Sequence, residues 1–230
     1  MQNQYRRTAM RQAGFMTLSM LLLQVVAGAE PLYAPFSEYA MPQQSEIALA
    51  RSAAPESITA HATIEVLTSK GYDIAARGDN GFLCMVLRGW SAAPDPHDTR
   101  NSKIRGPACF DPVAARTVGP AEHLKAKLGL EGKSPDEIDH EVAAQYGLGK
   151  LPKMEGGAFA YMWSASQHIG PQAGPWHPHM MVYIPYYENR LLGNNPVGDH
   201  RTPFVVGDGT PYSIVMIPVD DKLAIKAAEK

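Results

Sequence analysis

The sequence predicts an α+β fold: one loop-rich domain with an antiparallel β-meander, further short strands and two or three helices. Three observations lead to this fold class. The chain has 230 residues, 45% of them apolar, which suits one domain with a sizeable core. Strand-like apolar runs stand in the first and last thirds of the chain, and helix-start signals lie between them. All 19 prolines follow residue 30, and this density favours short strands and ordered loops over a helical bundle.

The first 29 residues have the pattern of a secretory signal peptide. Three arginines, Arg6, Arg7 and Arg11, precede an apolar run over 15–26, which leads to an A-x-A cleavage site. We expect cleavage after Ala29 and a periplasmic or secreted mature protein. We expect no transmembrane span after cleavage, because the run is shorter than the ~20 residues that cross a bilayer. A retained membrane anchor is the alternative, and the Arg6-Arg7 pair leaves Sec and twin-arginine export both open.

The charge of the mature chain excludes a basic surface for nucleic acid. Removing the leader and its three arginines leaves 18 Lys and Arg against 23 Asp and Glu over residues 30–230. No excess of cations is then available for phosphate contacts. The two cysteines exclude a disulfide-dense scaffold and a Cys-rich zinc domain. No internal repeat or change of composition divides 30–230, so we expect a single domain.

The two ends of the mature chain are expected to differ from its middle. Residues 30–44 combine prolines with aromatic side chains and predict an extended arm that packs on the domain. A short helix follows over 45–51, with Pro55 shortly after its end. At the other end, residues 220–230 form a charged tail.

Three strand-like runs cover 62–67, 71–77 and 81–88. The first run alternates between apolar and polar residues, and the third is apolar on both faces. Short connections join the runs, and the second connection ends in Asn80-Gly81, a pair that favours a hairpin turn. We therefore expect a three-stranded antiparallel meander whose third strand is central and buried.

Residues 89–112 contain four prolines and no hydrophobic period, which predicts a long loop. This loop carries Cys109, the only available partner for Cys84. In an oxidising periplasm we expect a Cys84–Cys109 disulfide that pins the loop to the buried strand, worth roughly 3.5 kcal/mol in the chain-entropy model. The alternative is Cys84 as a nucleophile, which the apolar neighbours Leu83 and Met85 disfavour because they disfavour the thiolate.

Two helices are predicted between the strand-rich thirds. The first covers 120–128 and stops at Gly129. The second begins at a capping box over 134–137, with proline at the first helical position, and Gly147 can end it.

The second of these helices has one narrow apolar stripe. Ile138, Val142 and Tyr146 stand four residues apart and therefore share one face. The acidic side chains of both helices, with His123 and His140, are expected on a solvated face.

Four β-rich segments alternate with proline-bearing loops in the last third of the chain. They cover 158–164, 180–184, 203–206 and 212–219. Each is short and bounded by turn-forming residues, which indicates strands rather than helices.

Several motifs resemble a family of secreted bacterial proteins with no assigned activity. The matching features are E-I-A-L-A-R-S-A-A-P at 46–55, N-G-F-L-C-M-V at 80–86, C-x-D at 109–111, Y-M-x-S at 161–164 and H-P-H-M-M at 177–181. They cover most of the mature chain. The resemblance implies export and a single domain, and it implies no chemistry.

The densest group of potential metal ligands is the W-H-P-H run at 176–179. Positions i and i+2 of an extended strand point to one face, so His177 and His179 can present two nitrogens to a divalent metal such as zinc. His168 and His200 are the candidates for further ligands. The alternative for each is a hydrogen-bonded structural histidine.

Two weaker constellations suggest other chemistry. Ser164 and Ser166 follow an apolar strand and lie close in sequence to His168. A serine here is a candidate hydrolytic nucleophile, although the G-x-S-x-G elbow is missing. Aromatic side chains in predicted loops suit recognition of a ligand or a protein, although each is also a candidate core residue. The aromatic residues concerned are Tyr33, Phe36, Tyr39, Trp90, Tyr161, Trp163, Trp176, Tyr183, Tyr186 and Tyr187.

We therefore expect an exported envelope protein that acts as a binding or structural module, with a small molecule or an envelope protein as partner. The alternative is a metal-dependent hydrolase centred on His177 and His179, assisted by His168, His200 or Glu188. Its metal would activate a bound water as nucleophile. The sequence assigns no catalytic residue and leaves open whether the protein is an enzyme. The two functions differ in what they need: the hydrolase needs three converging ligands, and the module needs an accessible surface.

Overall fold

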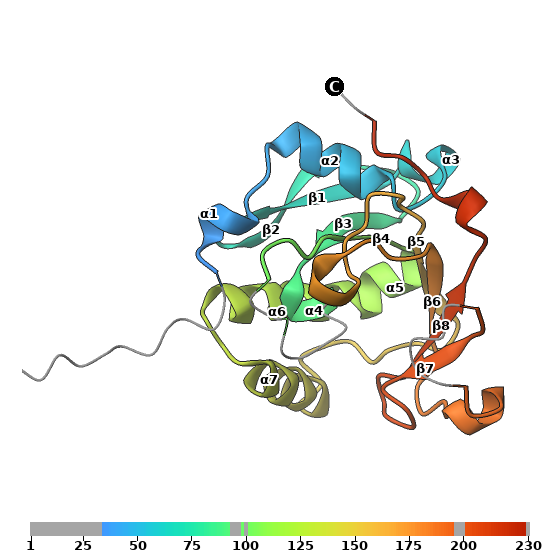
Figure 1. Cartoon of the computed structure of the whole chain (residues 1–230). Helices are drawn as coiled ribbons and strands as arrows, with labels where there is room; N and C mark the ends of the chain where they lie inside the picture. The colour runs from blue at the N-terminus through green and yellow to red at the C-terminus, as the bar shows by residue number, and fades with distance from the viewer. Residues whose placement is uncertain (1–33, 93–97, 99–100, 196–200, 229–230) are drawn as a thin grey trace, which may run out of the picture. The chain divides into compact units, whose positions relative to one another are not determined.

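The computed structural model describes residues 34–92, 98, 101–195 and 201–228. They belong to one compact unit, Pro31–Lys230. A mixed eight-stranded sheet runs through this unit, with helices on both faces (Figure 1). The predicted signal peptide and its cleavage site after Ala29 lie outside the described residues. Within the described part of the chain, no helix has the length and apolar character that crossing a membrane requires.

The strands follow the order β2-β1-β3-β4-β5-β6-β8-β7 across the sheet. Their bounds are β1 Thr63–Thr68, β2 Gly71–Ala76, β3 Leu83–Leu87, β4 Gly106–Phe110, β5 Ala158–Met162, β6 His179–Tyr183, β7 Phe204–Val206 and β8 Ile214–Pro218. All neighbouring strands are antiparallel except β1 and β3, which are parallel. The α+β class is confirmed, with β2 and β7 as the edges of the sheet.

An antiparallel meander is present, but it is not formed by the three runs that the sequence indicated. It consists of β3, β4, β5 and β6, which are consecutive in the chain and adjacent in the sheet. β1 and β2 form the expected hairpin, whereas β3 pairs with β1 in parallel, through Thr63 with Leu83 and Ile64 with Cys84. The expected burial of this third run is confirmed, because every residue of β3 is buried.

The connection from β2 to β3 explains why Asn80-Gly81 makes no hairpin. The His61 carbonyl oxygen accepts hydrogen bonds from the backbone N–H groups of Asp79 and Asn80, at 2.9 and 3.3 Å. Gly78 passes so close that a Cβ atom there would lie 2.1 Å from the same oxygen. The chain therefore crosses the start of β1 and enters β3 on the far side of β1, with Gly81 at a φ of +77°.

Helices cover both faces of the sheet (Figure 1). The α-helices are α1 Phe36–Tyr39, α2 Gln43–Arg51, α3 Glu56–Thr59, α4 Gly89–Ala92, α5 Pro112–Thr117, α6 Gly119–Leu130 and α7 Pro135–Gly147, and the 3-10 turns are η2 Pro171–Ala173, η3 Asn189–Leu192 and η4 Asp221–Leu223. α2 packs on β1, β3 and β4. On this face Ile64, Cys84 and Val86 form a buried cluster with Leu49 and Ala50 of α2.

The opposite face of the sheet holds the larger core. Leu83, Met85 and Phe110 alternate with the residues under α2 and pack with Ala114 of α5 and Tyr183 of β6. α6 follows α5 directly and contacts β2, α4 and α7. The alternation of β3 side chains between two covered faces explains why this strand reads as a continuous apolar run.

The expected loop over 89–112 was wrong in part, because it contains α4 and the interior strand β4. All five residues of β4 are buried, so the strand shows no apolar–polar alternation. Pro107 also reads as a strand breaker. In the sheet Pro107 pairs with Val86 of β3. The pairing of β4 with β5 involves only Cys109 and Phe110, so the missing N–H of Pro107 does not interrupt it.

The Cys84–Cys109 disulfide is formed. The two residues stand directly opposite each other in the β3–β4 ladder, and both are fully buried. The bridge therefore joins two core strands under α2 rather than a loop to a strand. With both sulfurs in the bridge, Cys84 offers no thiol for nucleophilic attack.

The two predicted helices are present, and α6 extends beyond the expected 120–128 at both ends. α7 begins with the expected capping box: the Ser134 hydroxyl accepts a hydrogen bond from the Glu137 N–H at 3.2 Å, and the Glu137 carboxylate accepts one from the Ser134 N–H at 2.8 Å. Ile138 and Val142 are buried as expected. The solvated face was wrong for Glu122 of α6, which is only 6% exposed, and holds only in part for His123, which is partly buried against Glu65.

Two short helices replace predicted irregular structure. Within the expected extended arm over 30–44, α1 places Tyr39 in the core, with its ring 5.1 Å from that of Trp90. α5 follows β4, and the Asp111 side chain caps it by accepting a hydrogen bond from the Ala114 N–H at 2.8 Å. The aspartate of the C-x-D motif therefore has a structural role.

Each of the four β-rich segments in the last third coincides with a strand, β5 to β8, and β6 begins one residue before the predicted 180–184. The expected charged tail forms η4 and then runs beside the residues that follow β5. Ile225 exchanges two backbone hydrogen bonds there, from its N–H to the Trp163 carbonyl and from the Ala165 N–H to its own carbonyl, both at 2.7 Å.

Candidate functional site

His177 and His179, the predicted metal ligands, lie in different environments at the start of β6. His179 belongs to β6 and is 3% exposed, and its Nδ1 donates a hydrogen bond to the His177 carbonyl oxygen at 2.9 Å. His177 is exposed, and its Nδ1 lies 2.8 Å from Oδ1 of Asp221. Both residues border a hollow of about 10 Å³, which has room for about one water.

The other predicted ligands do not join them in the described structure. Nδ1 of the exposed His168 lies 3.2 Å from the Ala173 carbonyl oxygen. Glu188 binds Arg190 at 2.5 and 3.0 Å. Within the residues that the structure describes, no three His, Cys, Asp or Glu side chains are arranged to hold a metal. His200 lies outside these residues, so the four-histidine site stays a prediction.

Ser164, the candidate nucleophile, is fully buried in a hydroxyl network. Ser52 donates to the Leu49 carbonyl oxygen at 2.6 Å, so Ser164 is the donor in the 2.7 Å contact between the two hydroxyls. The Ser164 oxygen also accepts a hydrogen bond from the Ser166 N–H at 3.1 Å. This network ties the end of α2 to the segment after β5, and no histidine activates the hydroxyl in the described structure.

The described aromatic side chains of the predicted set do not form an exposed surface, which was one of the two alternatives that the sequence left open. Tyr39 and Tyr183 are buried, and Tyr161 packs edge-to-face on Trp163 with ring centroids 5.1 Å apart. Among the described aromatic residues of that set, Tyr186 alone is a largely exposed hydrophobic, at 66%. Recognition through an aromatic patch therefore has little support from the described structure.

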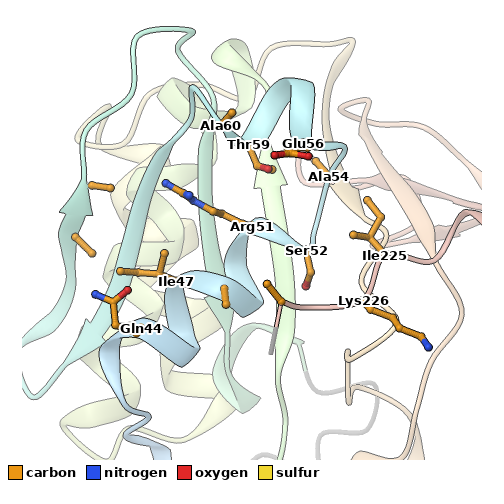
Figure 2. A pocket seen from close by; sticks show the side chains of 14 residues that line it. Gln44, Ile47, Arg51, Ser52, Ala54, Glu56, Thr59, Ala60, Ile225 and Lys226 are labelled. Atoms are coloured by element: carbon orange, nitrogen blue, oxygen red, sulfur yellow. The ribbon is translucent and has the colours of Figure 1, made fainter. Parts of the chain in front are cut away.

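A groove of about 610 Å³ lies on the α2 face of the sheet (Figure 2). α2, α3, the edge strand β2 and the chain after η4 form its walls. This volume falls within the range of roughly 300–1,000 Å³ that ligand pockets occupy. Six of its fourteen lining residues are alanines, and their short side chains leave the space between the walls open.

The groove exists because α2 leaves the edge of the sheet uncovered. α2 packs on β1, β3 and β4, one strand inward from β2. A β-bulge shapes the uncovered edge: Ile64 pairs with Ala76 and Glu65 pairs with Ile74, so Ala75 of β2 has no opposite residue. Ala75 and Ala76 both line the groove, although neighbouring side chains of a regular strand point to opposite faces.

Three charged side chains line the groove, the cations Arg51 and Lys226 and the carboxylate Glu56. Arg51 is the last residue of α2 and is exposed, and in Figure 2 its side chain extends away from Glu56 and Lys226. The hydrogen bonds and ion pairs of the described residues include no partner for the side chain of Arg51 or Lys226. Both cations are therefore available to an anionic group of a ligand.

A buried ion pair holds the α2 wall in place. Arg88 follows β3, and its Nη2 donates to the Glu46 carboxylate of α2 at 2.7 Å, with both side chains at most 1% exposed. The same carboxylate oxygen accepts a hydrogen bond from the Leu67 N–H of β1 at 3.1 Å. Glu46 thus connects α2, one wall of the groove, to β1 and to the end of β3.

A histidine on α6 and a glutamate on β1 form an ion pair that does not line the groove and that the sequence did not reveal. Nε2 of His123 on α6 lies 2.6 Å from the Glu65 carboxylate of β1, which is 7% exposed. The hydrogen bond to Glu65 raises the pKa of His123 above its usual 6.5, while partial burial acts in the opposite direction. Only the spacing of His123 and Glu65 in the fold reveals the pair, since 58 residues separate them in the chain.

This pair predicts a pH-dependent share of the stability. Because the pKa of His123 is raised in the folded state, the pair stabilises the protein fully below the unfolded-state value of about 6.5 and loses that effect as the pH rises through the folded-state pKa. We expect His123→Gln to lower the free energy of unfolding more at about pH 5.5 than at about pH 9. Urea titrations at both values measure the difference. An equal loss at both pH values would contradict the assignment, and exposed His140→Gln is the control.

The sequence carried little sign of the groove. Its α2 wall is the E-I-A-L-A-R-S-A-A-P run at 46–55, in which small residues are as typical of close helix packing as of an open site. The single signal was Arg51, a lone cation within a stretch of apolar and small residues over 47–54.

No protein-family model, curated protein or solved structure matches the chain.

Proposed function

We propose that the protein is an exported envelope module that binds a ligand in the groove between α2 and β2. The groove itself carries this proposal, because its volume of about 610 Å³ is that of a ligand site and its walls are short side chains with two available cations.

Export is part of the proposal and has two supports. The first 29 residues carry the n-region, apolar run and A-x-A site of a signal peptide. The buried Cys84–Cys109 disulfide suits an oxidising compartment such as the periplasm. We therefore place the groove and its ligand outside the cytoplasm.

A thermal-shift screen of the mature protein tests ligand binding. The probes are short peptides, amino sugars, carboxylic acids and phosphate esters. A ligand at about 100 times its Kd stabilises by about 2.7 kcal/mol, which raises the Tm of a 200-residue domain by roughly 5–10 °C. We expect at least one probe class to do so for the wild type and not for Ala48→Trp, in which an indole fills the groove.

Two further variants separate loss of binding from loss of folding. Ala60→Trp fills the groove from an exposed position at the end of α3, and Ala143→Trp places the same side chain on an exposed position of α7. We expect Ala60→Trp to lose the shift and Ala143→Trp to keep it. The proposal is wrong if no probe stabilises the wild type, or if the groove variants respond as the wild type does.

A further inference from the structure

The groove runs along an edge strand whose outer side is paired with no other strand of the described structure. Among the described strands, β2 pairs with β1 alone. In any edge strand, alternate N–H and C=O groups point outward and offer hydrogen bonds to an added strand. In β2 the Ile74 N–H donates a hydrogen bond at 3.2 Å to the side chain of the preceding residue, Asp73. A carbonyl oxygen of an added strand can take the place of this side chain as the acceptor.

The position of the groove brings this edge and a helix together. α2 supplies one wall, through Ile47, Ala48 and Arg51, and β2 supplies the facing wall through Ala75 and Ala76. Peptides that add a strand to a sheet gain affinity from main-chain hydrogen bonds and specificity from pockets that receive alternate side chains. The groove is such a pocket, because it lies directly beside the open edge and is bordered by short side chains.

The charges of the groove favour a peptide that carries a carboxylate. Arg51 and Lys226 outnumber Glu56, and both cations are exposed without a partner among the described residues. A guanidinium matches a carboxylate with two parallel hydrogen bonds. Since Arg51 ends α2 on the groove wall that faces β2, it can receive an acidic side chain that reaches into the groove from a strand added to the edge of β2.

We propose that the ligand of the groove is an extended acidic peptide segment that adds a strand to β2 and places a carboxylate on Arg51. This inference rests on the proposed function and specifies its ligand class. β2 has six residues and is about 20 Å long at ~3.4 Å per residue, so a matching segment has five to seven residues. The occupant is an exported or surface-exposed chain, in keeping with the proposed location.

Selection from a library of displayed octapeptides, followed by calorimetry, tests the inference. We expect peptides with Asp or Glu to be enriched on the wild type and absent on Ala48→Trp. For a selected acidic peptide, we expect Arg51→Gln to raise Kd at least tenfold relative to the wild type. When the acidic residue of the peptide is replaced with its amide, we expect Arg51→Gln and the wild type to bind this peptide with the same Kd. Lys150→Gln, which removes an exposed cation outside the groove, is the matched control.

Backbone readouts distinguish strand addition from other binding. Every second N–H of an added strand faces β2, and the others face away from it. N-methylation of the first set is expected to abolish binding, and N-methylation of the second set is expected to leave the affinity unchanged. Hydrogen exchange at the amides of β2 is expected to slow at least tenfold in the complex. A ligand from the thermal-shift screen that fills the groove without any peptide binding would overturn the inference and leave the proposed function intact. Peptides that bind Ala48→Trp as they bind the wild type would overturn the inference as well.

Discussion

Replacing Arg88 with methionine is expected to lower the free energy of unfolding by about 3–5 kcal/mol. Arg88 and Glu46 are at most 1% exposed, and their contact is 2.7 Å long. Methionine leaves the Glu46 carboxylate buried without its cation, with a single remaining hydrogen bond from the Leu67 N–H. The Val86 carbonyl oxygen loses its bond from Arg88 and keeps the one from the Tyr72 hydroxyl at 2.7 Å.

Urea unfolding of a double-mutant cycle measures this effect. We expect Glu46→Gln combined with Arg88→Met to be less destabilised than Arg88→Met alone, because the pair then buries no charge. The exposed Lys133–Glu137 pair is the matched control, and Lys133→Met is expected to change the free energy of unfolding far less than Arg88→Met does. A loss below about 1 kcal/mol for Arg88→Met would show that the carboxylate is not held in a dry site.

Removing the disulfide is expected to cost about 3.5 kcal/mol in the chain-entropy model for a loop of 25 residues. The double variant Cys84→Ala/Cys109→Ala and the reduced wild type should both show this loss in urea unfolding. Their difference isolates the packing of the two sulfurs, which lie in one cluster with Ala50 of α2 and with Ala53 just after this helix.

Burial also predicts how the disulfide reacts. Both cysteines are fully buried, so dithiothreitol reaches the bridge only after β3 and β4 open. We expect the reduction rate to rise in step with the fraction of unfolded protein as urea is added. Rapid reduction in the absence of urea would contradict the packing of α2 over these strands.

The sequence predicted the parts of the fold that local signals determine. The capping box at Ser134 and the stripe through Ile138 and Val142 marked α7, and alternating or apolar runs marked every strand except β4. β4 was missed because both of its faces are covered and Pro107 lies where no ladder to β5 forms. The pattern of a few neighbouring residues does not show that a segment is buried when elements distant in the sequence cover it.

Topology and site geometry depended on contacts that no local pattern contains. Asn80-Gly81 favours a hairpin locally, but the N–H groups of Asp79 and Asn80 donate hydrogen bonds to the His61 carbonyl oxygen, and the chain crosses the start of β1. The histidine pair His177 and His179 has the spacing of metal ligands, yet the two rings bond to an aspartate and a carbonyl group. The groove appears only when residues 44–60, β2 and the C-terminal segment come together, so sequence spacing gave no sign of it.

The most direct test of the groove as the binding site is an amide chemical-shift map of the mature protein with the best ligand from the thermal-shift screen. We expect the largest shifts at Ala48, Arg51, Ala75 and Ile225, which line the groove from three sides. Shifts centred instead on the residues of the small hollow, such as His177 and Met216, would contradict the account and return attention to the histidine pair.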